Sequence, residues 1–222
     1  MSEHDSGKLL QAVEAIAISP ADAHAVVERL GAQSRKDNPN EPDAAHQERV
    51  AEHIVSRYSS LAATAGGITA LAGVIPGIGT AVAMIGGGAT DAVVCMKLQV
   101  DMCMCLAAAF GHDLREPDAR HLAFLIAAGG ALEKAGVEAG AQMASKAGVN
   151  MLRQYLKGAA LQAVKEFFKK VGIVFTRTAL EKGLPFGIGV VLGAGGDYAL
   201  TQYVGAQATK WFVLDREDRS PS

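Results

Sequence analysis

Apolar residues recur every three or four positions along most of the chain, the spacing that places side chains on one face of an α-helix. The alternating Val and Ile patterns that are typical of strands are missing. The pattern therefore predicts an all-α fold, a single domain of about eight helices. The longer predicted helices cover residues 5–17, 20–30, 43–64, 91–110, 118–128, 150–182 and 197–214.

Helix start and stop signals divide the chain into four parts. Ser19 followed by Pro20 predicts an N-cap and a first helical residue, and Gly31 predicts the end of that helix. Residues 32–42 are polar and contain two prolines, which favours a linker. We expect an N-terminal helical extension at 1–31, a linker at 32–42, a helical domain at 43–214 and a disordered tail at 215–222.

One long segment carries no charge. The 33 residues from Tyr58 to Thr90 contain no Asp, Glu, Lys or Arg, and they include eight glycines and Pro76. The segment is long enough to span a bilayer, but proline and glycine interrupt a simple spanning helix. It therefore predicts two short apolar helices, at about 61–74 and 79–87, joined by a turn.

A shorter copy of this segment returns near the C-terminus, so the chain contains a pseudo-repeat of two glycine-rich apolar hairpins. The shared residues are Pro76, Gly77 and Gly79 in the first copy and Pro185, Gly187 and Gly189 in the second. Two interpretations stay open. The hairpins either enter lipid or line a lipid-binding cleft, or they pack together as buried core, where glycine permits close backbone contact.

Each glycine-rich segment ends at an aspartate. Asp91 and Asp197 are candidate carboxylates facing a cleft, or residues at helix N-termini, where the helix dipole favours a negative charge. Lys97 and Asp101 lie four residues apart in one predicted helix, which favours an i,i+4 ion pair.

The net charge of −2 conceals a local excess of positive charge. Between Lys146 and Lys182, eight basic residues face only two acidic ones, so this segment carries +6 and the remainder −8. A global basic surface for nucleic acid is therefore absent, and nucleic acid is not an expected partner. The predicted helix at 150–182 instead combines lysines with an apolar face, a pattern typical of an interfacial membrane binder or of a solvated bundle helix. The expected contact residues are Lys157, Lys165, Lys169, Lys170 and Phe168.

Motifs for common chemistry are missing, and we assign neither catalytic residues nor a cofactor. The glycines do not form a Walker A loop or a GxGxxG fingerprint. No GxSxG, HExxH or ExxH string occurs, so no metal site is predicted, and the interior serines (Ser56, Ser59, Ser60 and Ser145) have no assignable histidine partner. Cys95, Cys103 and Cys105 fall in one predicted helix, which favours reduced thiols in a cytoplasmic protein.

Three stretches together resemble the EcsC family, a bacterial group of helical proteins named for a protein encoded beside an ABC transporter. They are the first glycine-rich segment, ATDAVVCMKLQVDMCMCLAAAFGHDL, and the closing LPFGIGVVLGAGGDYALTQYVG, and the likeness covers about residues 45–214. The shared features are small residues and their spacing, without a catalytic signature. The resemblance implies a cytoplasmic or membrane-associated helical protein and transfers no catalytic residue.

These patterns favour a peripheral membrane-associated or lipid-binding protein that uses the hairpins and the basic helix. The polar, acidic start MSEHDSGKLL predicts no signal peptide, so we expect a cytoplasmic location on the inner face of the membrane. Membrane lipid is then the expected partner. Two alternatives stay open: a soluble adaptor that binds a protein partner, and a lipid acyl hydrolase with an unconventional nucleophile.

Overall fold

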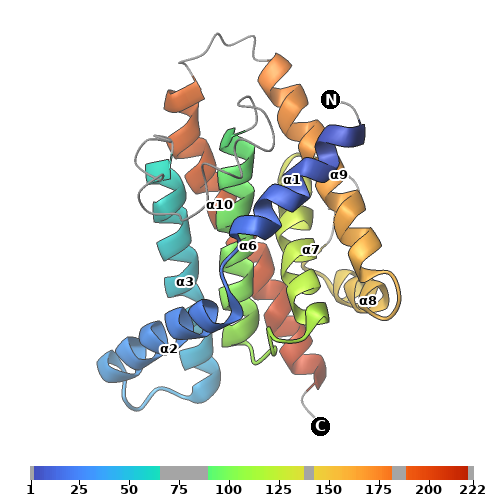
Figure 1. Ribbon diagram of the computed structural model, residues 1–222. Helices are drawn as coiled ribbons and strands as arrows, with labels where there is room; N and C mark the ends of the chain where they lie inside the picture. Colours follow the sequence, from blue (N-terminus) through green and yellow to red (C-terminus); the bar gives the residue numbers. More distant parts are fainter. Residues whose placement is uncertain (1–2, 66–89, 138–142, 182–188, 220–222) are drawn as a thin grey trace.

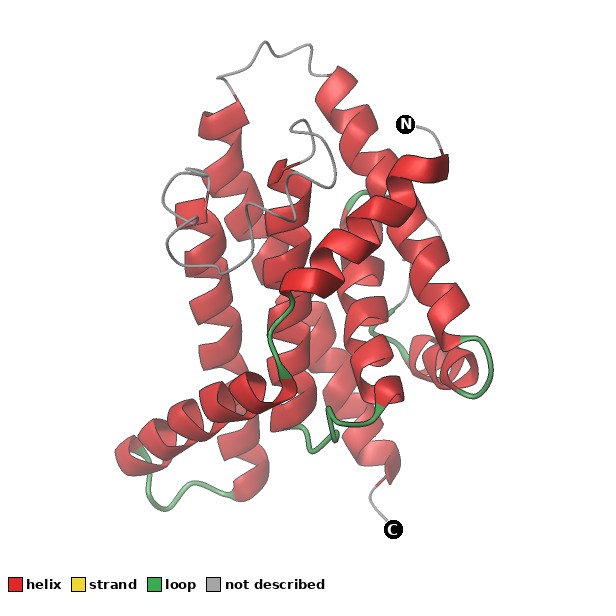
Figure 2. Cartoon of the chain, viewed as in Figure 1, coloured by secondary structure: helices red, strands yellow, loops and turns green. Residues whose placement is uncertain are grey.

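The computed structural model describes residues 3–65, 90–137, 143–181 and 189–219 (Figure 1). Within these residues the fold is all-α, with eight helices and no strand, as the apolar spacing predicted (Figure 2). The helices are α1 (Glu3–Ile16), α2 (Pro20–Asp37), α3 (Asp43–Ala65), α6 (Thr90–Ala109), α7 (Pro117–Lys134), α8 (Lys146–Leu156), α9 (Ala160–Glu181) and α10 (Gly189–Arg219).

Helix α6 lies at the centre of the bundle, where α3, α7 and α10 pack around it (Figure 1). Every residue from Ala92 to Ala107 is buried. A helix that is apolar on all sides is stable only when other elements cover every side. Helix α1 crosses α6 and packs on α9, while α2 packs on α3 and α6. Both N-terminal helices are therefore part of the same packed body as the bundle.

Glycines of α7 and α10 allow four of these helices, α3, α6, α7 and α10, to approach closely. A Cβ on Gly205 of α10 would lie 2.6 Å from Val55 Cγ1 of α3 and 3.1 Å from Met102 Sδ of α6. On α7, a Cβ on Gly130 would lie 3.3 Å from the Val204 methyl groups of α10. Small residues at such crossings bring helix backbones together.

The predicted linker is partly helical. Helix α2 begins at the predicted Ser19 cap, where the Ser19 hydroxyl accepts a hydrogen bond from the Asp22 amide, but it continues past Gly31 to Asp37. Gly31 stays helical where it faces His46 and Val50 of α3, which a Cβ would meet only at 3.9–4.0 Å. Ser34, three residues further, is fully buried. Packing against α3 therefore extends the helix beyond the residue that predicted its end.

The long amphipathic helix predicted at 150–182 is wrong, because the structure divides it. Helix α8 ends at Leu156, a turn follows at 157–159, and α9 begins at Ala160. Gly158 lies in this turn with open space around it. Ser145 caps the start of α8, where its hydroxyl accepts a hydrogen bond from the Gly148 amide. The sequence pattern could not separate the two helices because both keep apolar residues at helical spacing.

Helix α10 is longer at both ends than predicted. It begins at Gly189 and runs through Gly195 and Gly196 to Arg219, so residues 215–219 are helical and not a disordered tail. Four charged residues of the predicted tail make ion pairs: Asp215 with Arg153 and Arg219, Arg216 with Glu48, and Asp218 with Arg153. Charged composition alone suggested disorder, but these charges have partners in the fold.

Candidate functional site

The exposed face of α9 carries two large apolar residues beside lysines. Leu161 is 46% exposed and Ile173 is 49% exposed. Only one other large apolar residue in the described part of the chain, Tyr198, is classed as exposed. Lys165 lies one turn after Leu161 and is exposed, as is Lys170. Because residues at intervals of four share a helix face, Leu161, Lys165, Lys169 and Ile173 form one line along α9.

The opposite face of α9 fixes this orientation. Val164, Phe168 and Val171 are buried against the bundle, and the Phe168 ring lies 5.7 Å from that of Phe124 on α7. Phe168 was predicted as a membrane contact, and that prediction is wrong because the side chain is fully buried. The pair Phe167–Phe168 reads as an apolar face in the sequence, but the fold uses this face for its core.

The lysines occupy different environments. Lys157 is exposed, but it lies in the turn after α8 and not on α9, so it is not in line with the other lysines. Lys170 is exposed, with its Nζ 6.0 Å from the centre of the Phe167 ring. Lys169 is half-buried. The expected basic stripe is therefore divided between the turn at 157–159 and helix α9.

One acidic residue of α1 lies close to this surface. Burial raises the pKa of the Glu14 carboxyl, and the positive charges of His121 and Lys165 oppose the rise. Glu14 is thus near enough to Lys165 to weaken the positive potential of the α9 face.

The predicted hairpin residues fall mostly outside the described residues. This holds for Pro76, Gly77, Gly79, Pro185 and Gly187, while Gly189 is the first residue of α10.

The two candidate cleft carboxylates occupy different positions. Asp91 follows Thr90 in the first turn of α6, as predicted, and its side chain is outside the described part. Asp197 lies within α10 and not at its N-terminus, so the prediction that a helix starts at Asp197 is wrong. The cause is the earlier start of α10, because the glycines before Asp197 are themselves helical.

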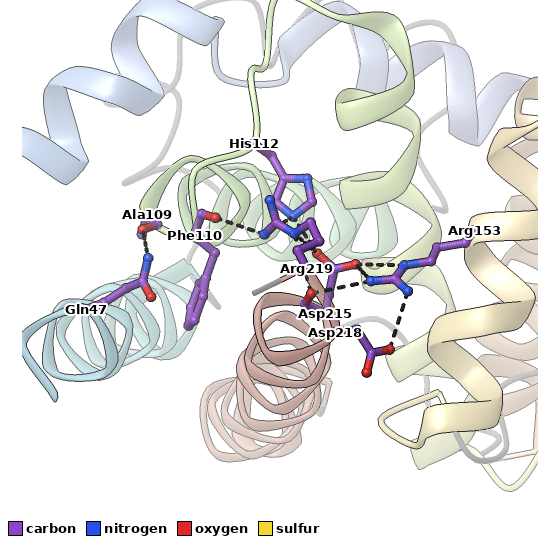
Figure 3. A network of polar contacts seen from close by, with 8 residues as sticks. All are labelled: Gln47, Ala109, Phe110, His112, Arg153, Asp215, Asp218 and Arg219. Atoms are coloured by element: carbon purple, nitrogen blue, oxygen red, sulfur yellow. Dashed lines mark hydrogen bonds and ion pairs between the residues drawn. The ribbon is translucent and has the colours of Figure 1, made fainter. Parts of the chain in front are cut away.

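A second polar cluster, centred on Asp215, joins three distant segments (Figure 3). Arg153 of α8 donates to Asp215 Oδ1 at 2.6 Å, and Arg219 Nε lies 2.8 Å from Asp215 Oδ2. His112, in the turn between α6 and α7, places Nε2 at 3.3 Å from Oδ2. Burial alone would raise the pKa of Asp215, but the hydrogen bonds from His112 and Arg153 and the charge of Arg219 hold it below its usual value.

This Asp215 cluster fastens the end of α10 to the bundle. Arg219 also donates to the Phe110 carbonyl at 3.2 Å, and Gln47 of α3 donates to the Ala109 carbonyl at 2.7 Å (Figure 3). These bonds satisfy carbonyls at the end of α6 that have no partner within the helix. Sequence reasoning missed the cluster because its members are distant in the chain and belong to no motif.

The predicted pair of Lys97 and Asp101 is confirmed, and both side chains are buried in α6. Asp101 also accepts a hydrogen bond from the Ile18 amide at 2.8 Å, which holds the connection between α1 and α2 on the bundle. Burial raises the pKa of the Asp101 carboxyl, and Lys97 opposes the rise. The pair therefore has a structural role on the side of α6 that faces the N-terminal helices.

The described residues do not assemble a reactive centre. Ser59 is fully buried, and its hydroxyl finds no hydrogen-bond partner among the described residues, whether histidine or other. Cys95, Cys103 and Cys105 are buried and form no disulfide within the described residues, and burial raises the pKa of the Cys105 thiol to about 12. Protonated thiols are poor nucleophiles and poor metal ligands. Across the described part of the chain, no three His, Cys, Asp or Glu residues group as a metal site.

One helix of the described part is long and apolar enough to cross a membrane. It is the segment Ala92–Ala109 of α6, and 89% of it is buried inside the fold.

Comparisons with known proteins found no match to this chain. No protein-family model matches the chain, and neither a curated protein nor a solved structure matches it. The resemblance to the EcsC family therefore stays a prediction, and the functional argument depends on the geometry described above.

Proposed function

We propose that this chain is a peripheral membrane protein that binds anionic lipid surfaces through the exposed face of α9. The observation that carries the proposal is the line of Leu161, Lys165, Lys169 and Ile173, in which two exposed apolar side chains flank two lysines. Interfacial helices combine apolar side chains that enter the boundary between headgroups and acyl chains with lysines that face anionic headgroups. The inner leaflet of a bacterial membrane is the surface we assign, because cytoplasmic leaflets are negatively charged.

The strength of such a contact follows from its parts. Full burial of a Leu or Ile side chain contributes about 1.5–3 kcal/mol, so burying the exposed half of each contributes about 1 kcal/mol. Each lysine near an anionic surface adds about 1 kcal/mol. Leu161, Ile173 and three lysines together give about 5 kcal/mol, an apparent dissociation constant in the sub-millimolar range. Binding of this strength is reversible, as a peripheral protein requires.

The test is co-sedimentation of the purified chain with two kinds of vesicle, at low and high salt. One kind is phosphatidylcholine alone, and the other contains phosphatidylglycerol in addition. We expect binding to the anionic vesicles only, and less of it at high salt, because salt screens exposed charges. Binding that survives high salt would assign the contact to apolar insertion and not to the lysines.

Variants assign the binding to the α9 face. Charge reversal by Lys165→Glu with Lys170→Glu should abolish sedimentation with anionic vesicles, and Glu14→Gln should strengthen it because a nearby negative charge is removed. The matched control reverses two exposed lysines on other helices, Lys36→Glu on α2 and Lys210→Glu on α10. It changes the net charge equally and should reduce binding much less. Equal loss in both double variants would contradict a specific role for α9.

Two alternative functions have distinct outcomes in the same preparation. A soluble adaptor would leave all vesicles unbound and form a stable complex with a protein partner. A lipid acyl hydrolase would turn over phospholipid and lose that activity on one Ser→Ala substitution.

A further inference from the structure

A cavity of about 730 Å³ lies between the start of α2 and the turn that joins α6 to α7. Its walls include His24 of α2, and His112, Asp113 and Arg115 of the turn. Ligand pockets commonly enclose about 300–1,000 Å³ and carry a few polar groups that converge on the ligand. None of the residues that line this cavity belongs to α9, so it is separate from the proposed lipid contact.

Buried groups hold the His112 ring in place beside this cavity. Its Nε2 lies 3.3 Å from Asp215 Oδ2 and 3.4 Å from Arg219 Nη2 (Figure 3). The ring also packs against the edge of Phe212, with 5.3 Å between the ring centroids. Because Nε2 already has these neighbours, Nδ1 is the nitrogen of His112 that is left to bind a ligand in the cavity.

His24 brings a second imidazole to the same cavity from a different helix. It is half-buried on α2, and its ring makes no hydrogen bond to another side chain in the part of the chain that the structure describes. Hydrogen bonds from Arg115 lower the pKa of the Asp113 carboxyl to about 2, and the nearby charge of His24 adds to this shift. His24 is therefore close to the turn, and the two histidines line the cavity from opposite elements.

The carboxylates around the cavity already have partners. Arg115 donates to both oxygens of Asp113, at 2.9 Å from Nε and 2.7 Å from Nη2. Asp22 Oδ2 accepts a hydrogen bond from the Ser19 hydroxyl at 2.7 Å. Asp215 is held by two arginines. The groups left to bind a ligand are thus the two imidazoles, and a protonated imidazole donates from both of its nitrogens.

We propose that this cavity binds a phosphate group, held between the rings of His24 and His112. A phosphate monoester has several acceptor oxygens and a negative charge, so it can accept hydrogen bonds from two imidazolium rings at once. A metal ion fits less well, because the described residues provide no third ligand beside the two histidines. Binding should strengthen from about pH 8 to about pH 6, the range in which histidines usually gain their charge.

The histidine ring signals of a ¹⁵N-labelled chain test this site directly. Inorganic phosphate, added at constant ionic strength, should shift the signals of His24 and His112 along one saturating curve, with a Kd on the order of 1 mM for two charge-assisted hydrogen bonds. His53, exposed on α3 and outside the cavity, should not follow that curve. Shifts that do not saturate, that are equal at His53, or that chloride reproduces would overturn the proposal.

Alanine variants assign the binding to the cavity. His24→Ala removes one imidazole and leaves the Asp215 cluster intact, so we expect a folded chain with about tenfold weaker phosphate binding, because one charge-assisted hydrogen bond is lost. His53→Ala is the matched control on α3 and should bind phosphate as tightly as the unsubstituted chain. Unchanged binding in His24→Ala, or an equal loss in His53→Ala, would contradict the site.

The same variants identify the source of the phosphate group. Phosphatidic acid carries a phosphate monoester as its headgroup. If this headgroup enters the cavity, vesicles that contain phosphatidic acid should sediment less of His24→Ala than of the unsubstituted chain. Equal sedimentation, together with weaker binding of inorganic phosphate, assigns the site to a soluble phosphate compound. The binding of inorganic phosphate does not depend on the lysines of α9, so this proposal and the proposed function fail independently.

Discussion

Helices α6 and α9 are both rich in apolar residues, but the fold uses them in opposite ways. Helix α6 meets the length and composition of a membrane-spanning helix, yet its neighbours bury 89% of that segment. Helix α9 interrupts its apolar residues with lysines, and it is the helix that exposes Leu161 and Ile173. The helix that looks most like a membrane segment is thus the core of the bundle. The proposed lipid contact is the more polar helix at its edge.

The difference between α6 and α9 shows that apolar content alone does not distinguish a core helix from a helix that contacts lipid. Apolar content measures how much of a helix leaves water, but a protein core and a lipid bilayer satisfy that requirement equally. The distribution of charge around the helix is more informative. On α6 the charges of Lys97 and Asp101 pair inside the fold, while on α9 Lys165 and Lys170 are exposed on the helix that also exposes Leu161 and Ile173.

The largest loss of stability is expected when a charge is left unpaired inside α6. Asp101→Asn retains an oxygen that can accept the Ile18 hydrogen bond but removes the partner of buried Lys97. Because an uncompensated buried charge is strongly destabilising, we expect a loss of about 3–5 kcal/mol in the free energy of unfolding. Urea denaturation followed by circular dichroism measures the loss.

The control removes both charges of this pair. Lys97→Met together with Asp101→Asn should recover most of the lost stability, since replacing a buried ion pair by uncharged groups is often nearly neutral. If the double variant is as unstable as the single one, the pair's charges are not the cause.

A smaller effect should follow from separating α10 from α3 and α6. Gly205→Ala places a Cβ 2.6 Å from Val55 Cγ1, so side chains must shift or the helices must move apart. We expect a loss of about 1–3 kcal/mol, typical of overpacking. The same substitution at Gly195, exposed on α10 with open space around it, should instead stabilise by about 0.5–1 kcal/mol, because alanine favours the helix. Thermal unfolding of the two variants tests these opposite signs.

The Asp215 cluster is an intermediate case, because a buried carboxylate has partly exposed partners. The side chains of Arg153 and Arg219 are 31% and 44% exposed, so Asp215→Asn should cost only about 1–2 kcal/mol at pH 7. The pKa of Asp215 is lower in the folded protein than its usual value of about 3.9. Its stabilising effect is therefore present above pH 4 and is lost as the pH falls through the folded pKa. Urea unfolding at pH 7 and at pH 3 should show the difference between Asp215→Asn and the unsubstituted chain shrinking at low pH.

The sequence predicted the all-α fold and several helix starts because these follow from local rules. Ser19 and Pro20 mark the start of α2, and the apolar spacing marks α3 and α6. The ends of α2 and α10 could not be predicted, since helix packing and ion pairs override local signals for a helix end. Gly31 stays helical against α3, and Asp215 is held by arginines of two elements.

The candidate site on α9 was also predictable only in part, because tertiary packing decides which side chains are exposed. The lysines of α9 are visible in the composition of the segment, and Lys165 and Lys170 are exposed as expected. Phe168 was placed on the wrong face, since a pair of neighbouring aromatics does not reveal which member faces the core. The Asp215 cluster depends on tertiary contacts between distant segments, and no local sequence pattern indicates it.

The smallest effect on stability is expected on the exposed face of α9, which is the proposed lipid contact. Leu161→Ser with Ile173→Ser replaces the two exposed apolar residues of α9, and substitutions on an exposed surface rarely change the free energy of unfolding by more than about 0.5 kcal/mol. The affinity for anionic vesicles should nevertheless fall by about thirtyfold, because the exposed halves of both side chains, about 1 kcal/mol each, no longer enter the lipid boundary. Unchanged stability with lost binding separates a surface that faces lipid from one that packs in the core. A variant that unfolds instead would show that α9, like α6, is covered on this face.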